Sequence, residues 1–219
     1  MSIHEGHRER LRKKFCQGSL EDHELLELLL FYSIPRCNTN EQAHQLLRRF
    51  GSLDAVMNAE LNELQSVEGI GLTSAIQIKA VGEIMGRCAR SRVDSRYLLS
   101  SYEALESYLL ALFIGSSREK TFLLLFNAAN RLICCEMLGE GNATQTPVCL
   151  RRAVELALQK NAAAALLAHN HADGLVIPSD IDVATTERVR EALENVGVRF
   201  VEHYIVTPDR CIPILRRQK

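Results

Sequence analysis

The sequence predicts an α+β protein in which an all-helical N-terminal domain precedes a domain of mixed strands and helices. Three observations predict this class. Apolar residues recur at helical spacing through the first part of the chain, up to Met85. From Phe122 onward, short apolar runs typical of buried strands alternate with helical patterns. The chain of 219 residues is long enough for two such domains, each with its own core.

The N-terminal domain is expected to be a short helical bundle. Helical spacing covers Glu21–Phe50, where Pro35 separates two runs, and a further helix-like stretch covers 52–66. The segment Val67–Gly71 then leads into the apolar-periodic run that ends at Met85. Every element expected in this part of the chain is therefore a helix.

The second domain is predicted to follow a connecting segment. The stretch Arg87–Arg96 is polar, basic and without periodicity, and it fits a linker or the frayed end of a helix. We place the boundary near Ser95, which gives domains 1–95 and 96–219. Along the second domain we expect a helix over 102–113, strands over 122–126 and 132–138, a helix over 147–159, a buried strand over 163–168, a helix over 179–195, and strands over 198–206 and 212–215.

Composition and charge limit the classes of function. Apolar residues make up 47% of the chain and charged residues 24%, which is the balance of a folded globular protein. The 26 basic residues are matched by 27 acidic ones, divided 13 against 13 up to Tyr97 and 13 against 14 after it. Because nucleic-acid affinity rests mainly on the neutralisation of phosphates, the lack of a basic domain argues against tight binding.

Features missing from the sequence indicate its cellular location. The segment Met1–Phe15 is rich in charge and lacks the apolar core of a signal peptide. No apolar run approaches the ~18 to 20 residues that span a bilayer. The seven cysteines are odd in number and lack C-x-x-C spacing, so we expect reduced and mostly packed thiols. A cytoplasmic protein without membrane contact is predicted.

The strongest chemical pattern is His169-Asn170-His171 after an apolar strand, followed by Ser179 and Asp182. Side chains two apart on an extended segment point the same way, so both imidazoles can face one ion. Asp182, in the first turn of the next helix, can supply a third ligand. Two imidazoles, one carboxylate and a fourth position for water form the ligand set of a catalytic zinc.

The same segment has a purely structural interpretation. Ser179 and Asp182 also have the spacing of a helix N-cap and its third helical residue. A His-x-His pair by itself is a weak signal. The combination of both patterns, directly after a buried strand and in a loop that contains Gly174, favours the metal site.

This arrangement resembles a known family. His-x-His-x7-Ser-x2-Asp, from His169 to Asp182, is the JAMM motif, and its surroundings from Asn161 resemble the RadC branch. The likeness covers nearly the whole chain, since three upstream segments also resemble RadC proteins: 25–29, 46–53 and 67–71. It implies a JAB/MPN domain, a cytidine-deaminase-like three-layer α/β/α fold, after a helical region with a helix-hairpin-helix.

Two positions depart from the family pattern. The family usually continues His-Asn-His with Pro-Ser-Gly, where this chain has Ala172-Asp173-Gly174. The usual Asp-His pair near the C-terminal strand is Glu202-His203 here. Neither departure removes a ligand, although both can alter the shape of the pocket and its pH behaviour.

The resemblance implies a zinc-dependent amide or isopeptide hydrolase acting on peptides or protein conjugates. Its ligands would be His169, His171 and Asp182, while Ser179 would help to stabilise the oxyanion. The general base of the family opens the strand after the first helix of the domain, and this position matches Glu119. Glu136, on the next strand, is the competing candidate.

The turn Gly69-Ile70-Gly71 supports a different class of function. It resembles a helix-hairpin-helix, whose backbone N–H groups at a helix N-terminus suit a phosphate. A turn used only for packing or protein contact fits equally well, because Glu68 precedes it and the domain is not basic. The alternative function is that of a DNA-associated repair or recombination accessory protein with a structural or vestigial zinc site.

Other histidines and cysteines fit known motifs poorly. His4-Glu5-Gly6-His7 lacks the i, i+4 spacing of a zincin helix and is interpreted as solvated terminus. A zinc deaminase would need Pro-Cys-x-x-Cys, whereas Cys134 and Cys135 are adjacent and should point to opposite faces of a strand. His203 could support the metal site or lie partly exposed on the surface.

Overall fold

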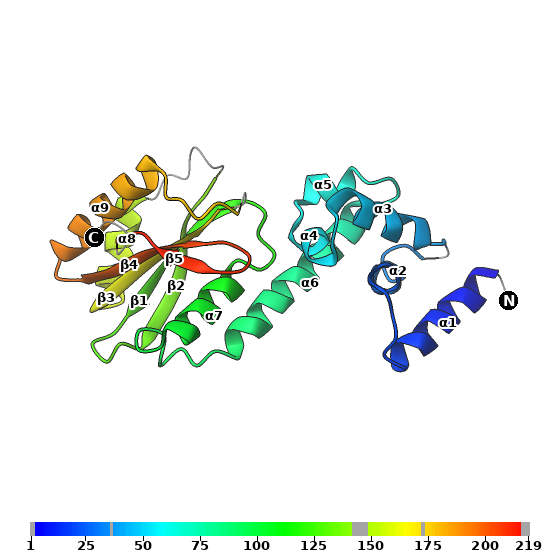
Figure 1. The fold of residues 1–219 in the computed structure, drawn as a ribbon, viewed down its shortest axis with the longest axis horizontal. Coiled ribbons are helices and arrows are strands. Elements are labelled where there is room, and N and C mark those ends of the chain that lie inside the picture. The colour runs from blue at the N-terminus through cyan, green and yellow to red at the C-terminus, as the bar shows by residue number, and fades with distance from the viewer. Residues whose placement is uncertain (1–2, 36, 142–148, 172–173, 216–219) are drawn as a thin grey trace. The chain divides into compact units, whose positions relative to one another are not determined.

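The computed structural model describes residues 3–35, 37–141, 149–171 and 174–215. The chain divides into two compact units, residues 1–85 and residues 86–219 (Figure 1). Helix α6 (Leu72–Ser91) begins in the first unit and ends in the second. As predicted, the fold is α+β, with helices in the N-terminal part and a mixed sheet with helices after it.

The first unit is built from helices around one apolar core. Besides the start of α6, its helices are α1 (Ile3–Cys16), α2 (Asp22–Leu30), α3 (Asn40–Phe50), α4 (Leu53–Asn58) and α5 (Leu61–Gln65). Leu26, Leu46 and Ile78 are fully buried in this core, so α2, α3 and α6 each direct an apolar stripe inward.

Two expectations about this unit are wrong. The helix-like stretch 52–66 is two helices, because the chain leaves helical geometry at Ala59 and Glu60 caps a new helix with its own capping box. The N-terminal segment is not solvated terminus but helix α1, in which Arg8 donates to the backbone oxygens of Ile34 and Cys37 after α2. Charge-rich composition hid this helix, since its charged residues include His7 and Lys14, which bind Glu27 and Glu24 of α2.

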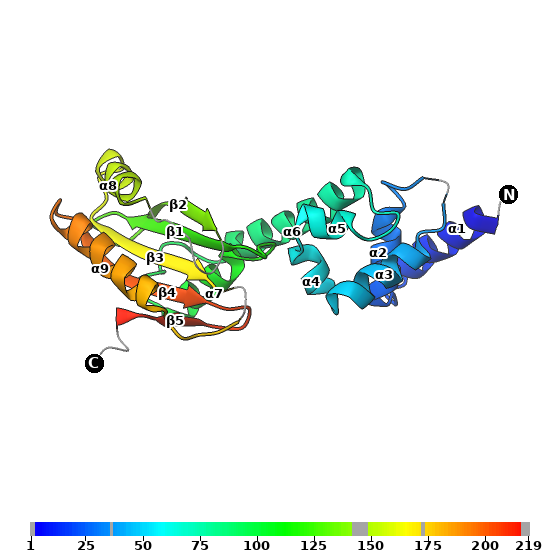
Figure 2. The same ribbon diagram turned by 90° about the horizontal axis from the view of Figure 1, so that it is seen from above.

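The second unit is a three-layer α/β/α arrangement. Its strands are β1 (Glu119–Phe126), β2 (Leu132–Gly141), β3 (Ala164–Asn170), β4 (Arg199–Val206) and β5 (Cys211–Pro213), in the order β2-β1-β3-β4-β5. Only β3 and β4 pair in parallel; the other neighbours are antiparallel. Helix α7 (Tyr102–Leu112) covers one face, while α8 (Leu150–Gln159) and α9 (Asp180–Glu194) cover the other (Figure 2). The predicted start of α8 near Pro147 lies outside the described residues.

Strand alternation separates the two sides of the sheet. On β3, Leu166 and Ala168 pack in the core beneath α7, whereas Ala165 and Leu167 pack in the core beneath α8 and α9. His169 follows this alternation onto the α9 face. Cys134 and Cys135 divide in the same way between the two cores, as their adjacency predicted.

Strand β4 contains one residue more than regular pairing requires. Ala165 pairs with Phe200 and Leu167 pairs with His203, so two steps along β3 match three along β4. The extra residue is a β-bulge, which shifts all later side chains to the opposite face. His203 therefore faces α9, as Phe200 does, and the alternation expected over 198–206 is interrupted.

Two further expectations concern surfaces. None of the helices in the described part of the chain is long and apolar enough to cross a membrane.

All seven cysteines are free thiols, but the expectation that most are packed is wrong. Four of them are exposed: Cys16, Cys37, Cys88 and Cys149.

Candidate metal centre

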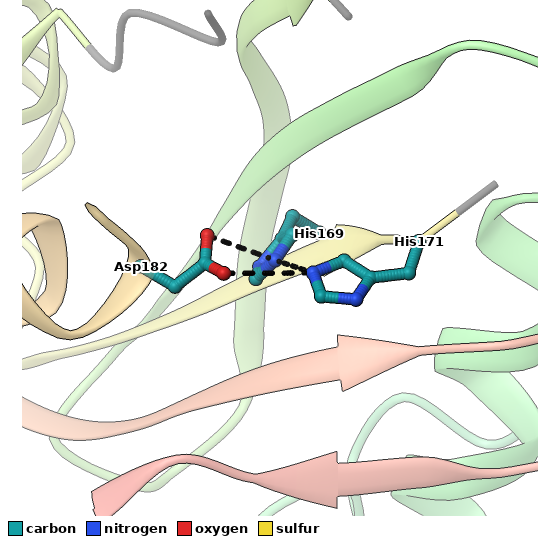
Figure 3. A group of neighbouring side chains, drawn as sticks. All are labelled: His169, His171 and Asp182. Atoms are coloured by element: carbon teal, nitrogen blue, oxygen red, sulfur yellow. Dashed lines mark hydrogen bonds and ion pairs between the residues drawn. The ribbon is translucent and has the colours of Figure 1, made fainter. Parts of the chain in front are cut away.

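Strand β3 positions both histidines of the motif. His169 lies near the end of the strand, opposite Thr121 of β1, and is 5% exposed. His171 follows the strand, and its backbone N–H still bonds to the oxygen of Val206 on β4. The extended backbone thus continues far enough for both imidazoles to lie on the α9 side (Figure 3).

Helix α9 supplies Asp182 through its capping box. Ser179 Oγ accepts from the Asp182 backbone N–H at 3.2 Å, and Asp182 Oδ2 accepts from the Ser179 N–H at 2.8 Å. The Ser179 hydroxyl also donates to Asp182 Oδ2 at 2.7 Å. The helix-cap interpretation and the clustering of Asp182 with the histidines are therefore both realised, because the cap fixes the carboxylate that faces them.

The three side chains converge on one point (Figure 3). His169 Nε2 lies 2.9 Å from His171 Nε2 and 3.2 Å from Asp182 Oδ1, and His171 Nε2 lies 3.6 Å from Asp182 Oδ2. Their side chains are only 6%, 11% and 19% exposed, respectively. Among the described residues, this is the group of three or more His, Cys, Asp or Glu side chains that could hold a metal.

In both rings, the hydrogen-bond partner of Nδ1, the outer nitrogen, decides whether Nε2, the inner nitrogen of the cluster, carries a proton or a lone pair. His171 Nδ1 lies 2.6 Å from the Leu175 carbonyl oxygen, which can only accept, so this nitrogen carries the proton. His169 Nδ1 lies 2.7 Å from Nε2 of His203, which is 2% exposed. Of the two alternatives left open for His203, partial exposure at the surface is thus wrong. In a neutral His171, the Nε2 that faces Asp182 carries a lone pair.

The electrostatics of the cluster favour a cation. Burial raises the pKa of the Asp182 carboxyl, but the contacts with His169 and His171 outweigh it and hold that pKa far below its usual range. The contact with Asp182 raises the pKa of His171, although burial opposes this shift. Without a metal, a proton on an imidazole would have to supply the positive charge that the carboxylate attracts.

The donor set and spacing fit zinc. Zn–N and Zn–O distances of about 2.0 to 2.2 Å in a tetrahedral site place neighbouring ligand atoms about 3.3 Å apart. The separations of 2.9, 3.2 and 3.6 Å surround this value. Two neutral imidazoles and one carboxylate also suit zinc better than the hard ions that prefer oxygen ligands.

Glu119 lies on the same side of the sheet as this cluster. It opens β1 two residues before Thr121, the partner of His169, so all three residues share the α9 face. Asn170 fixes this end of β1: its Oδ1 accepts from the Lys120 N–H at 2.7 Å and its Nδ2 donates to the Arg118 oxygen at 3.0 Å. The charge of Glu119 is among the lesser causes that raise the pKa of His171, after the contact with Asp182.

Glu136 lies farther from the histidines in the sheet. It lies on β2, opposite Leu123 of β1. Strand β2 is an edge strand, and β1 separates it from β3. This arrangement supports Glu119 as the base, although the assignment stays a prediction.

The Gly69–Gly71 turn lies in the first unit, between α5 and α6. Ile70 is 4% exposed and belongs to the helical core. Gly69 has φ +81, and a Cβ there would lie 2.7 Å from Gln42 Nε2. Much of this turn is thus explained by packing. Nothing lies within 4 Å of a Cβ placed on Gly71, which leaves that position open.

Three residues support the site although no motif in the sequence points to them. Asn170 bonds the start of β1, Thr186 contacts the Asp182 backbone oxygen and the His203 ring, and Glu202 accepts from the His203 N–H. A usable signal existed for Thr186, because it lies one helical turn after Asp182 and therefore on the same side of α9.

Fold and cluster together define a JAB-type domain with a His-His-Asp group that could hold a metal ion. The chain belongs to the family described as the RadC-like JAB domain, whose family model matches residues 99–218, more than half of the sequence. A second family model, the UPF0758 N-terminal domain, matches residues 1–76. The resemblance to RadC proteins is thereby confirmed in both parts of the chain. Of the family positions that differ here, Ala172 and Asp173 lie outside the described residues.

Proposed function

We propose that this protein is a zinc-dependent hydrolase that cleaves amide or isopeptide bonds in peptides or protein conjugates. One observation carries the proposal: the Nε2 atoms of two imidazoles and a half-buried carboxylate converge at separations that fit a tetrahedral ion. Hydrogen-bond acceptors placed so close together need a cation between them.

The chemistry follows from the groups around the cluster. Zinc bound here would lower the pKa of its water to about 7 and polarise the substrate carbonyl. Glu119, on the same face as His169, would accept the proton of the attacking water and pass it to the leaving amine. Ser179 would have to turn its hydroxyl from Asp182 toward the substrate oxygen in order to stabilise negative charge there.

Metal content tests the proposal directly. The purified protein should contain about one zinc per chain, since the three ligands form a single site. His169→Ala combined with His171→Ala should reduce zinc to background in elemental analysis. The control is His7→Ala in the first unit, which should keep full zinc. Unchanged zinc in the double variant would show that the metal is held elsewhere.

The identity of the base requires a separate comparison. Glu119→Gln should retain zinc but lose hydrolysis by about 10²- to 10⁴-fold, because the amide cannot accept a proton. Glu136→Gln makes the same change on β2 and should keep most activity. Candidate substrates would come from peptide and isopeptide libraries screened with the zinc-loaded wild type. If Glu136→Gln is inactive while Glu119→Gln is not, the two roles must be exchanged.

A further inference from the structure

The β-bulge of β4 determines where His203 points. With regular pairing after Phe200, His203 would face α7; the extra residue turns it toward α9 and His169. The buried carboxylate of Glu202 holds this irregular backbone. Its Oε1 accepts from the His203 N–H at 2.8 Å and from the Leu215 N–H at 2.9 Å. Glu202 is 2% exposed, so these bonds form away from water.

A chain of hydrogen bonds leads from α9 back to the cluster. The Thr186 hydroxyl lies 2.6 Å from the Asp182 backbone oxygen, which accepts only, so Thr186 donates its single proton there. Nδ1 of His203 lies 2.6 Å from the same hydroxyl and must therefore be the donor in that contact. The ring of His203 is buried in contact with Thr186 and His169 and is neutral, which leaves a lone pair on its Nε2.

The last contact in this chain involves a proposed ligand. His203 Nε2 lies 2.7 Å from His169 Nδ1, so the His169 nitrogen carries the proton. Nε2 of a neutral His169 then carries a lone pair, which is directed at Asp182 and His171. The direction of every bond follows from one backbone carbonyl, and that carbonyl belongs to Asp182.

We infer that Glu202, Thr186 and His203 form a positioning device that selects the metal-binding tautomer of His169 and links it to Asp182. The inference rests on the proposed zinc site but concerns residues outside the ligand set. Hydrogen-bond partners of ligating histidines fix ring orientation and raise ligand basicity, and their loss typically weakens metal binding by about 10- to 100-fold. An alternative role, in which His203 only fills space in the core, predicts no change in tautomer.

Three variants separate these roles. His203→Leu keeps an apolar volume but removes the acceptor for His169, whereas His203→Gln retains a carbonyl oxygen at a similar distance along the side chain. Thr186→Val is nearly isosteric and removes one hydroxyl, which both accepts from His203 and donates to the Asp182 backbone oxygen. The matched control is Thr185→Val, the same substitution at the preceding residue of α9, which lies outside the chain of hydrogen bonds.

Two measurements test the inference. Imidazole ¹⁵N shifts of the metal-free protein should show His169 protonated on Nδ1 in the wild type, and a mixture of tautomers in His203→Leu and Thr186→Val. Competition with a chromophoric chelator should show zinc binding about 10- to 100-fold weaker in His203→Leu. Binding should recover to within a few-fold in His203→Gln and stay unchanged in Thr185→Val.

The outcomes distinguish this inference from the zinc proposal. If wild type binds no zinc, the proposed function fails, and the tautomer of His169 in the metal-free protein still decides the inference. If zinc binds and folded Thr186→Val and His203→Leu keep both the wild-type tautomer and wild-type affinity, the positioning role is overturned. Thr186→Val alone decides the question by the same two measurements if His203→Leu does not fold.

Discussion

Each unit of this protein places a carboxylate beside a histidine, with the Glu27 side chain 1% exposed and that of Asp182 19% exposed, but the two contacts differ in which group supplies the proton. In the first unit, His7 Nε2 lies 2.7 Å from Oε1 of Glu27, which is 1% exposed. Arg10, which can only donate, lies 3.3 Å from the other ring nitrogen of His7, so the proton of a neutral His7 points at Glu27. In the second unit, the Nδ1 atoms of His169 and His171 carry the protons, and the lone pairs of the Nε2 atoms point at the Asp182 carboxylate.

The difference shows what distinguishes a structural contact from a site. The two oxygens of Glu27 face His7 and the Asn40 amide, which donates at 3.1 Å, so both are satisfied within the fold. Asp182 accepts from Ser179 in the same way, but its carboxylate also faces the Nε2 atoms of His169 and His171, which are acceptors when these rings are neutral. This second set of contacts is complete only when a cation joins it. The distance between ring and carboxylate does not separate a structural contact from a metal site. The partner of the other imidazole nitrogen does, because it decides whether a proton or a lone pair faces the carboxylate.

The largest expected effect concerns pH and zinc affinity. The contact with Asp182 raises the pKa of His171, and zinc can bind only the neutral ring. Zinc affinity should thus be constant at high pH and fall about tenfold for each pH unit below that raised pKa, which lies above the ordinary value of about 6.5. Chelator competition between pH 6 and 8.5 would measure it. A flat profile would remove His171 from the ligand set.

The metal-free protein should show the opposite trend. A group whose pKa is raised by folding contributes stability that is fully present below its unfolded pKa and is lost as the pH rises through its folded pKa. His171 should therefore stabilise the metal-free fold at acidic pH, where zinc binds poorly. Urea unfolding with and without chelator at pH 6 and 8 would separate the stability that comes from His171 in the metal-free fold from the stability that comes from bound zinc.

A second prediction tests the satisfied cluster of the first unit. Glu27→Leu should lower the free energy of unfolding by about 1 to 3 kcal/mol, because the His7 and Asn40 donors lose their acceptor. Zinc content should not change. The control is Glu41→Leu on α3, whose side chain is 62% exposed, with an expected effect within about 0.5 kcal/mol. A loss of zinc in Glu27→Leu would mean that the two clusters are not independent.

Much of the second unit could be predicted because its signals are local. Strand-length apolar runs located β1 and β3, and His-x-His after a strand placed two imidazoles on one side without knowledge of the topology. Asp182 was predictable because a cap residue has a fixed position relative to its helix. Each of these inferences needed only residues near one another in the sequence.

The remaining features depend on pairing between distant segments. The position of His203 follows from one extra residue in β4 relative to β3, and no periodicity within β4 reveals such a bulge. Helix α1 was missed for a related reason, since Arg8 and His7 bind partners that lie some twenty or more residues away. Polar long-range contacts leave no apolar pattern to detect.

The smallest expected effect concerns DNA. We propose that any DNA contact is weak and uses the turn before α6, where the first backbone N–H groups of a 20-residue helix offer donors to a phosphate. Ile70 and Gly69 are committed to packing, so the open position in this turn is Gly71. The net charge of −1 provides no general attraction for a polyanion.

Gly71→Asp is therefore the sharpest test of this contact. A Cβ at Gly71 meets nothing within 4 Å, so the variant should fold while placing a negative charge beside the donors. Gly6→Asp on α1 adds the same charge at another open position and serves as control. In titrations of duplex, single-stranded and branched DNA at two salt concentrations, weak wild-type binding should disappear in Gly71→Asp and persist in Gly6→Asp. Tight binding that survives Gly71→Asp would show that DNA is recognised by a different surface, and the packing interpretation of the turn would then be sufficient.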